Sequence, residues 1–383
     1  AYMLDKDKKV AYEPLMAAVK EAAAEEAEKA AGERRTVLGI AFDIDGDRVG
    51  FVTEDGEAFD GNATLAALAY GAVQEKAGVT VLINTKAIAP VYEYIEKIGG
   101  RAVWGHTGYS KLRKDILEEE AQGYEVSFGG EDSGHVLFPE NSYFDDGAYT
   151  ALKMMGLVGR HGLHLGEFLK GCQRVEILKE ARLKYSSQRE GEDVKTTQVR
   201  IRKEVLTDTM AVFEGEENKA YKVEEILNVD GPMVFVKKGE VKGRILVRTS
   251  LHEPVFSISI QSWMAGHAAV DLRAMKEMNL ALAQEFQGIL DRHPEVDQKK
   301  KLAKERIAPL EEEIARLDDS FTTSFGAEGR EAIDPNIFGS MDIRGTAEAE
   351  DDEGKPQKID LTDDLVERLS YGYGVAAQAT LPE

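Results

Sequence analysis

Apolar and polar residues change their spacing along the chain, and the changes separate segments with different predicted structure. Residues 10–31 have helical spacing and are rich in Ala and Glu, which favours a helix that ends near Gly32. The following segment predicts alternating strands and helices: strands at 37–42 and 49–52, a helix at 62–77, a strand at 79–84, a helix at 88–98 and a strand at 101–104. Such alternation at short spacing is typical of βαβ units with a mostly parallel sheet.

The pattern of apolar and polar residues changes near residue 172. Extended runs then predict an α+β domain with an antiparallel sheet: residues 197–202, 233–237, 244–248 and 255–261, followed by a helix at 268–290. The predicted fold class is therefore α/β, with mixed or parallel-sheet βαβ domains and a later α+β domain. Ligands of open parallel sheets bind at the carboxyl ends of the strands, where polar loop residues are expected.

Two charged segments come later in the chain. Residues 298–317 place five apolar side chains on roughly one helical stripe, with Pro309 interrupting it, which predicts a solvated helix packed through that stripe. Residues 347–354 are strongly acidic and predict an exposed loop.

Composition narrows the classes of function. The chain has 383 residues and a formal net charge of −22, and this acidic excess argues against nucleic acid or an anionic membrane as a partner. The single cysteine, Cys172, permits no internal disulfide, and the sequence has neither a membrane-spanning apolar stretch nor the apolar core of a signal peptide. We expect a cytoplasmic protein.

An acidic loop separates the first two predicted strands. Residues 43–47 read Asp-Ile-Asp-Gly-Asp, and Asp43, Asp45 and Asp47 repel one another unless a cation lies among them. Alternation along an extended loop turns the three carboxylates toward one point, and hard oxygen ligands suit Mg²⁺ or Ca²⁺. Arg48 follows as a fixed positive charge that can hold a phosphate oxygen. Two alternatives stay open for this loop: a solvated turn, and a haloacid-dehalogenase-like phosphatase with Asp43 as nucleophile.

Two further motifs support a phosphorylated sugar as substrate. Residues 129–135 follow a predicted strand and present the carboxylate of Glu131 beside the hydroxyl of Ser133, a pairing that suits vicinal sugar hydroxyls. Residues 247–254 end another strand with Arg248, a hydroxyl pair that includes Ser250, and a turn. This second loop has the groups that anion-binding loops use to hold a phosphate.

The ordered set of motifs resembles the phosphomannomutase/phosphoglucomutase (α-D-phosphohexomutase) family. Asp-Ile-Asp-Gly-Asp-Arg at 43–48, Gly-Glu-Asp-Ser-Gly-His at 130–135 and Arg-Thr-Ser-Leu-His-Glu-Pro at 248–254 look like its metal, sugar and phosphate loops. Residues 104–113 look like the family's segment with a catalytic-site lysine. The resemblance implies a Mg²⁺ cofactor and the following roles: metal ligands Asp43, Asp45 and Asp47; catalytic Arg48, Lys111, Arg113 and Arg344; substrate contacts Thr107, Gly108, Glu131, Ser133, His135, Arg248, Ser250 and His252.

One expected part of that family is missing from the sequence. Its members carry the transferred phosphoryl group on the serine of a Thr-Ala-Ser-His-Asn-Pro-like loop, and no such segment occurs in these residues. Residues 336–345, which include Arg344, resemble instead the segment that normally opens the family's first domain. The order of the parts therefore suggests a permuted or incomplete member. The expected domains are 1–60 (part of domain 2), 61–170 (domain 3), 171–292 (domain 4), 293–333 (a charged helical linker) and 334–383 (the start of domain 1).

These observations lead to one main functional hypothesis. We expect a phosphohexomutase that moves a phosphoryl group on a hexose phosphate, with a second polypeptide as a possible source of the serine loop. The alternatives are a non-catalytic subunit that binds sugar phosphates, and the phosphatase named above.

Overall fold

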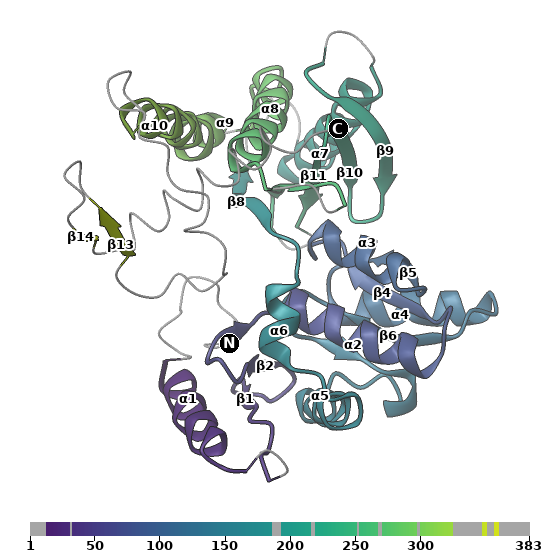
Figure 1. The fold of residues 1–383 in the computed structure, drawn as a ribbon. Coiled ribbons are helices and arrows are strands. Elements are labelled where there is room, and N and C mark those ends of the chain that lie inside the picture. The colour runs from purple at the N-terminus through teal and green to yellow at the C-terminus, as the bar shows by residue number, and fades with distance from the viewer. Residues whose placement is uncertain are drawn as a thin grey trace.

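The computed structural model describes residues 13–30, 33–185, 193–215, 219–250, 253–266, 270–296, 299–324, 347–350 and 356–359. Its main parts are an N-terminal helix with a small sheet, an α/β unit and an antiparallel unit covered by helices (Figure 1).

The N-terminal part consists of one helix and a three-stranded antiparallel sheet in the order β1-β2-β3. Its elements are α1 (Glu13–Ala27), β1 (Gly39–Phe42), β2 (Val49–Val52) and β3 (Ala58–Phe59). The helix packs on the sheet through Val19, whose side chain is 4% exposed. A Cβ atom at Gly39 would lie 2.7 Å from the Val19 side chain, so glycine allows this close approach. The acidic loop joins β1 to β2 and therefore lies at the carboxyl end of β1.

The α/β unit has a four-stranded sheet in the order β5-β4-β6-β7, in which β4, β5 and β6 are parallel and β7 is antiparallel. Its elements in chain order are α2 (Gly61–Glu75), β4 (Thr80–Asn84), α3 (Ala89–Lys97), β5 (Arg101–Gly105), α4 (Tyr109–Ala121), β6 (Val126–Gly130), β7 (Val136–Leu137), the 3-10 helix η2 (Pro139–Asn141), α5 (Gly147–His161) and α6 (Leu165–Lys170). All five residues of β4 are buried, as expected for the centre of a parallel sheet. Asp60 and Asp146 cap α2 and α5 by accepting backbone hydrogen bonds.

The antiparallel unit has five strands in the order β8-β12-β11-β10-β9 and two long helices. The elements are β8 (Val175–Lys184), α7 (Val194–Glu214), β9 (Lys222–Asn228), β10 (Pro232–Lys238), β11 (Val241–Thr249), β12 (Val255–Met264) and α8 (Leu272–Asp291). The prediction of an extended run at 197–202 was wrong, because these residues lie inside α7. Asp193 caps that helix, and Thr197, Ile201 and Val205 are buried four residues apart.

The later segments agree only in part with the sequence. The charged stretch is helical, in three pieces: α9 (Lys299–Leu302), the π-helix η3 (Ala303–Ile307) and α10 (Ala308–Ser324). The expected loop at 347–354 contains instead β13 (Ala347–Glu350), which pairs with β14 (Pro356–Ile359). Residues 336–345 lie outside the described residues. Among the helices that are described, none is long and apolar enough to cross a membrane.

Figure 1 shows that the α/β and antiparallel units lie side by side, and buried side chains join them. Glu93 of α3 accepts hydrogen bonds from Lys242 at 2.9 Å and from the Trp263 indole at 3.3 Å. Nearby, the Arg244 guanidinium lies 5.0 Å from the ring centroid of Trp104. The two units therefore share a packed junction, and loops at its edge hold fixed positions relative to one another.

Candidate functional site

The acidic loop folds as the sequence predicts. One oxygen each of Asp43, Asp45 and Asp47 lie within 4.8 Å of one another, and Gly46 has a φ of 75°, a left-handed conformation that glycine adopts at no steric cost. Asp43 accepts hydrogen bonds from the Gly46 amide at 3.1 Å and from the Arg48 amide at 3.2 Å. Local backbone contacts thus hold the loop in a shape that gathers its carboxylates.

Arg48 is paired with one of these carboxylates. Its Nε and Nη2 atoms both lie 2.6 Å from Oδ2 of Asp43, whose side chain is fully buried. Burial alone would raise the pKa of Asp43, but the hydrogen bonds and charge of Arg48 outweigh it and lower that pKa to about 2. The sequence assigned Arg48 to a phosphate oxygen, and in this structure the guanidinium binds the acidic loop.

His135 connects the acidic loop to the second motif. Its Nδ1 atom lies 3.8 Å from Asp47 and 2.6 Å from Asp145, the residue that precedes the cap of α5. Desolvation would lower the pKa of His135, but the contact with Asp145 and the charges of Asp145, Glu131 and Asp47 raise it overall. Burial raises the pKa of Asp47. The acidic loop and the 130–135 loop therefore meet at one charged cluster.

Glu131 is tied into its own loop and into the segment at 107–108. Its carboxylate accepts hydrogen bonds from the Gly108 amide at 2.5 Å and from the Ser133 hydroxyl at 3.1 Å, and the residue is 5% exposed. Burial raises the pKa of Glu131 despite these bonds. Glu131 and Ser133 lie side by side as predicted, and in this structure they bind each other.

A residue that the sequence analysis missed connects the remaining loops. Asp230, between β9 and β10, accepts hydrogen bonds from the Thr107 amide and the Thr85 hydroxyl, both at 2.7 Å. Its carboxylate also lies 3.8 Å from Lys111 Nζ and 3.9 Å from Arg248 Nη1. The available signal was the Asp-Gly pair at the end of a strand, which by itself marks only a turn.

The other predicted site residues are not all brought together. Lys111 and Arg248 come together at Asp230, as described. Arg113 lies elsewhere, with its guanidinium 5.7 Å from the ring centroid of Tyr143. The Ser250 hydroxyl accepts a hydrogen bond from the Glu253 amide at 3.2 Å within its own turn. His252 and Arg344 lie outside the described residues.

The acidic cluster has donors that fit a hard divalent cation. Carboxylate oxygens from Asp43, Asp45 and Asp47 converge, and this donor type suits Mg²⁺, Ca²⁺ or Mn²⁺. Buried oxygens of Asp47 and Asp145 have no hydrogen-bond partner, which is costly unless a cation or water satisfies them. Asp145 Oδ2 lies 2.6 Å from His135 Nδ1 and Asp47 Oδ1 lies 3.6 Å from Arg48 Nε, close enough for ion pairs but without hydrogen-bond geometry.

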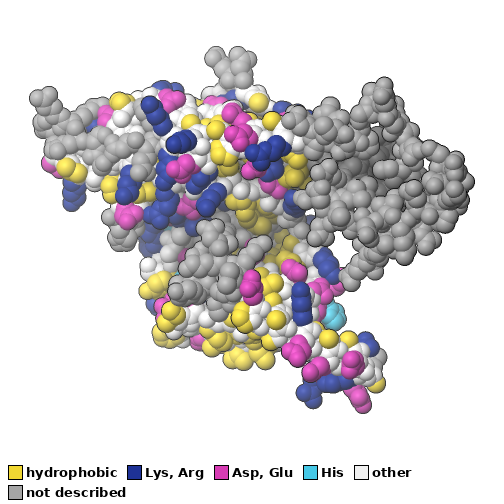
Figure 2. All heavy atoms as spheres, turned by 90° about the vertical axis from the view of Figure 1, so that its left-hand side faces the viewer, with side chains coloured by type: hydrophobic (Ala, Val, Ile, Leu, Met, Phe, Trp, Pro, Cys, Tyr) yellow, Lys and Arg dark blue, Asp and Glu magenta, His cyan; other side chains and the backbone are white. Residues whose placement is uncertain are grey.

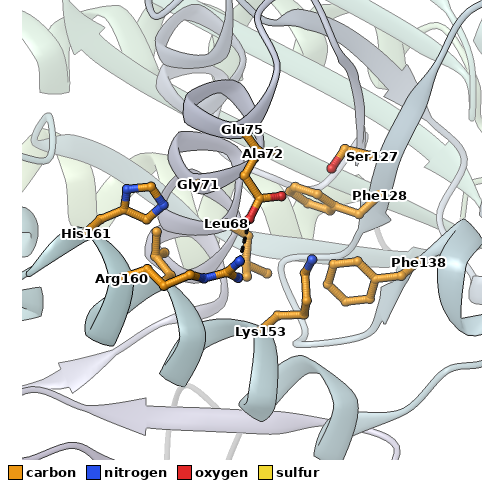
Figure 3. Close-up of a pocket in the computed structure, with 11 residues that line it drawn as sticks. Leu68, Gly71, Ala72, Glu75, Ser127, Phe128, Phe138, Lys153, Arg160 and His161 are labelled. Atoms are coloured by element: carbon orange, nitrogen blue, oxygen red, sulfur yellow. Dashed lines mark ion pairs between the residues drawn. The ribbon is translucent and has the colours of Figure 1, made fainter.

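Two cavities lie away from these loops. The cavity in Figure 3 lies between α2 and α5, where Arg160 pairs with Glu75 at 3.3 Å and Lys153 and His161 line one side. Its volume of about 20 Å³ has room for roughly one water molecule. A cavity of about 180 Å³ lies at the junction of the two units, near Trp104 and Glu93. Neither cavity is lined by the predicted site residues.

The molecular surface shows no obvious electrostatic route for a polyanion on the face in view. Figure 2 shows acidic and basic side chains interspersed over the described part of that face.

Known proteins resemble this chain through its α/β unit above all. Residues 60–175 match the family model described as phosphoglucomutase/phosphomannomutase, alpha/beta/alpha domain III. The phosphomannomutase/phosphoglucomutase of Pseudomonas aeruginosa is 36% identical over 124 residues, which cover 32% of this chain and 26% of that protein. That of Pseudomonas syringae pv. tomato is 25% identical over 226 residues, or 59% of this chain and 43% of that protein. The chain thus spans less than half the length of either relative.

A solved structure resembles this chain in fold over a longer part of the chain than residues 60–175. A phosphoglucomutase/phosphomannomutase family protein from Burkholderia thailandensis aligns with 77% of this chain and 52% of its own, with a TM-score of 0.53 and 21% sequence identity. At that identity the comparison shows a shared fold. It covers more of the chain than the family model does.

Proposed function

We propose that this chain contributes the metal, sugar and phosphate loops of a phosphohexomutase, because residues 60–175 match the model of the phosphoglucomutase/phosphomannomutase family. The reaction moves a phosphoryl group between two oxygens of a hexose phosphate. The assignment to domains 2, 3, 4 and 1, with the boundaries given above, is part of the same proposal.

The observation that carries the proposal is the convergence of three separate loops. His135 lies 3.8 Å from Asp47, Gly108 binds Glu131 at 2.5 Å, and the adjacent Thr107 binds Asp230 beside Arg248. Loops about 90 and 120 residues apart in sequence thus form one continuous line of polar groups. A hexose phosphate has a reacting phosphate, ring hydroxyls and a remote end, and it needs this kind of extended site.

Each part of the line has a chemical task in the proposal. Asp43, Asp45 and Asp47 hold Mg²⁺, which neutralises charge on the transferring phosphoryl group when bound. Glu131 and Ser133 exchange their mutual hydrogen bond for bonds to the sugar hydroxyls. Arg248 and Ser250 bind the phosphate that does not react. Arg48 would exchange its contact with Asp43 for one with a phosphoryl oxygen.

The source of the phosphoserine is the remaining part of the proposal. The sequence holds no Thr-Ala-Ser-His-Asn-Pro-like segment. We propose that a second polypeptide supplies the serine loop, and that the chain alone turns over little.

A mutase assay with glucose 1-phosphate and mannose 1-phosphate, primed with a hexose 1,6-bisphosphate, tests this function. We expect little turnover by the chain alone and turnover after addition of a fragment that carries the serine loop. Arg48→Gln should remove the restored activity, and Arg316→Gln is the matched control, because the exposed Arg316 pairs with Glu312 on α10, and no contact with the predicted site is found among the described residues. Binding of both sugar phosphates without restored turnover would instead identify a non-catalytic binding subunit.

The phosphatase alternative has less support. A nucleophilic Asp43 would need a free oxygen, whereas its carboxylate accepts hydrogen bonds from Arg48 and Gly46. Release of inorganic phosphate that Asp43→Asn abolishes would favour the phosphatase over the mutase.

A further inference from the structure

We propose that Asp230 is a positioning residue that brings Lys111 of the α/β unit and Arg248 of the antiparallel unit to one point, where both cations bind the same phosphate group. The inference rests on the proposed function, because it deepens the account of how the site holds a sugar phosphate. It adds Lys111 to the phosphate site and gives a role to a residue that no sequence motif marked.

Asp230 is fixed from both sides of the junction. Its side chain is 7% exposed, and one oxygen, Oδ2, accepts two short hydrogen bonds, from the Thr107 amide and the Thr85 hydroxyl. On the other side, Gly231 has a φ of 142°, and a Cβ there would lie 2.2 Å from the carbonyl oxygen of Val247. The turn is thus pressed against β11 next to Arg248. A buried carboxylate with this support keeps its place whether or not a ligand is present.

Lys111 and Arg248 lie near the Asp230 carboxylate, but it does not use all of their hydrogen-bond donors. Lys111 Nζ lies 3.8 Å from Oδ1 and Arg248 Nη1 lies 3.9 Å from Oδ2, longer than the hydrogen bonds from the two threonines. Their side chains are 42% and 20% exposed, so each retains donors that face solvent. Without the carboxylate between them, like charges would repel each other and the flexible lysine would move away.

The class of ligand follows from this arrangement. Two cations with free donors at one point suit a dianionic phosphate monoester better than a carboxylate or a neutral sugar. Holding both side chains beforehand lowers the entropy that binding must overcome. Asp230 also repels the phosphate, which opposes binding. The total affinity of an Asp230 variant therefore mixes two opposing effects, and the experiment has to isolate the positioning.

A double-mutant cycle makes that separation. Calorimetric titration of the full chain with inorganic phosphate at low ionic strength compares wild type, Lys111→Met, Asp230→Asn and the double variant. We expect Lys111→Met to weaken phosphate binding about tenfold in the wild-type background and about threefold or less in the Asp230→Asn background. An equal factor in both backgrounds, or no effect of Lys111→Met in wild type, overturns the inference.

Glu93→Gln is the matched control for loss of a carboxylate at the junction. Glu93 also connects the two units, through Lys242 and Trp263, but contacts neither Lys111 nor Arg248. Glu93→Gln should lower the melting temperature, and Lys111→Met should weaken phosphate binding in this background by the same factor as in wild type. A smaller factor would overturn the inference, because any weakening of the junction would then act like Asp230→Asn. Failure of the proposed function is a separate outcome: it requires that wild type binds no glucose 1-phosphate, which a parallel titration measures.

Discussion

The two ends of the candidate site are built in different ways. At the metal end, Asp43 is held by Arg48, only five residues away, and by the intervening Gly46. At the phosphate end, Asp230 is held by Thr107 and Thr85, which lie 123 and 145 residues away in sequence. The metal end is a single loop whose carboxylate is held by residues of the same loop. The phosphate end forms only where the α/β unit and the antiparallel unit pack together. Disturbing the packing between units should therefore damage the second end and spare the first.

Two carboxylates of the candidate site, Asp43 in the acidic loop and Glu131 in the 130–135 loop, have pKa values shifted in opposite directions. Burial would raise the pKa of Asp43, yet Arg48 lowers it to about 2, whereas burial of Glu131 raises its pKa above the usual value. A buried charge beside a guanidinium stabilises the fold, and a charge whose burial outweighs its favourable contacts costs stability. The pH dependence of unfolding can therefore distinguish the acidic loop from the 130–135 loop.

The largest expected effect comes from packing behind the 130–135 loop. Gly61 opens α2, and a Cβ there would lie 2.1 Å from the backbone carbonyl oxygen of Asp132. Gly61→Ala should reduce the free energy of unfolding by about 2–3 kcal/mol, because backbone cannot yield as a side chain can. Chemical denaturation measures the loss, and sugar-phosphate binding should weaken while metal binding by the acidic loop persists.

Gly159→Ala is the control for this change. Gly159 is an exposed glycine of α5 with nothing within 4 Å of an added Cβ. Alanine there should raise stability by about 0.5–1 kcal/mol through helix propensity alone. If Gly61→Ala behaved like this control, the close approach of α2 to the loop would be refuted.

The second effect concerns the metal end. Asp43→Asn should cost about 2 kcal/mol of stability at neutral pH, because a pKa lowered from 3.8 to about 2 corresponds to that energy. The contribution is present above pH 3.8 and is lost as the pH falls toward 2, so wild type and variant should converge there. Urea denaturation at several pH values measures it.

Asp45→Asn separates metal binding from stability at the same loop. Asp45 is exposed, so this substitution should leave the denaturation midpoint unchanged. Both variants should weaken Mn²⁺ binding, measured by titration of the metal. Retention of full Mn²⁺ affinity by both would show that the acidic cluster is a solvated turn.

The smallest effect concerns Glu131. Since burial raises its pKa, the ionised carboxylate costs stability at neutral pH, and the protein gains stability as the pH falls through that pKa. Glu131→Gln should raise the free energy of unfolding at pH 7 by no more than about 1 kcal/mol, and the difference should disappear toward pH 4. A gain that stays constant with pH would assign the effect to packing. The same variant should lose affinity for glucose 1-phosphate.

Sequence could predict the local end, whereas at the other end it could predict Arg248 and Lys111 but not the carboxylate of Asp230 that both contact. Two motifs are local: the three aspartates with Arg48 lie within six residues, and so do Glu131 and Ser133. Residues so close in sequence stay close in the folded chain. Asp230 lies in an ordinary turn, and its partners follow from the docking of two units, which no local pattern contains. The pairing of Arg48 with Asp43 was also missed, because a motif gives residue types and not the partner chosen without a ligand.

One wrong prediction of secondary structure also came from reading too short a stretch of sequence. Residues 197–202 alternate polar and apolar side chains and were predicted as extended, but the longer repeat of Thr197, Ile201 and Val205 has helical spacing. A window that included Asp193 would have revealed the helix cap. Short alternation is therefore weak evidence wherever a longer window supports a helix.

The start of α5 has a further consequence for how the acidic loop moves. The Gly147 amide donates to the Gly46 carbonyl at 3.1 Å, and a Cβ at Gly147 would lie 2.8 Å from that oxygen. The helix thus anchors the tip of a loop that precedes it by a hundred residues. Amide hydrogen exchange at Gly147 should then be slowed by cation binding, since opening the helix end and releasing the loop are the same event.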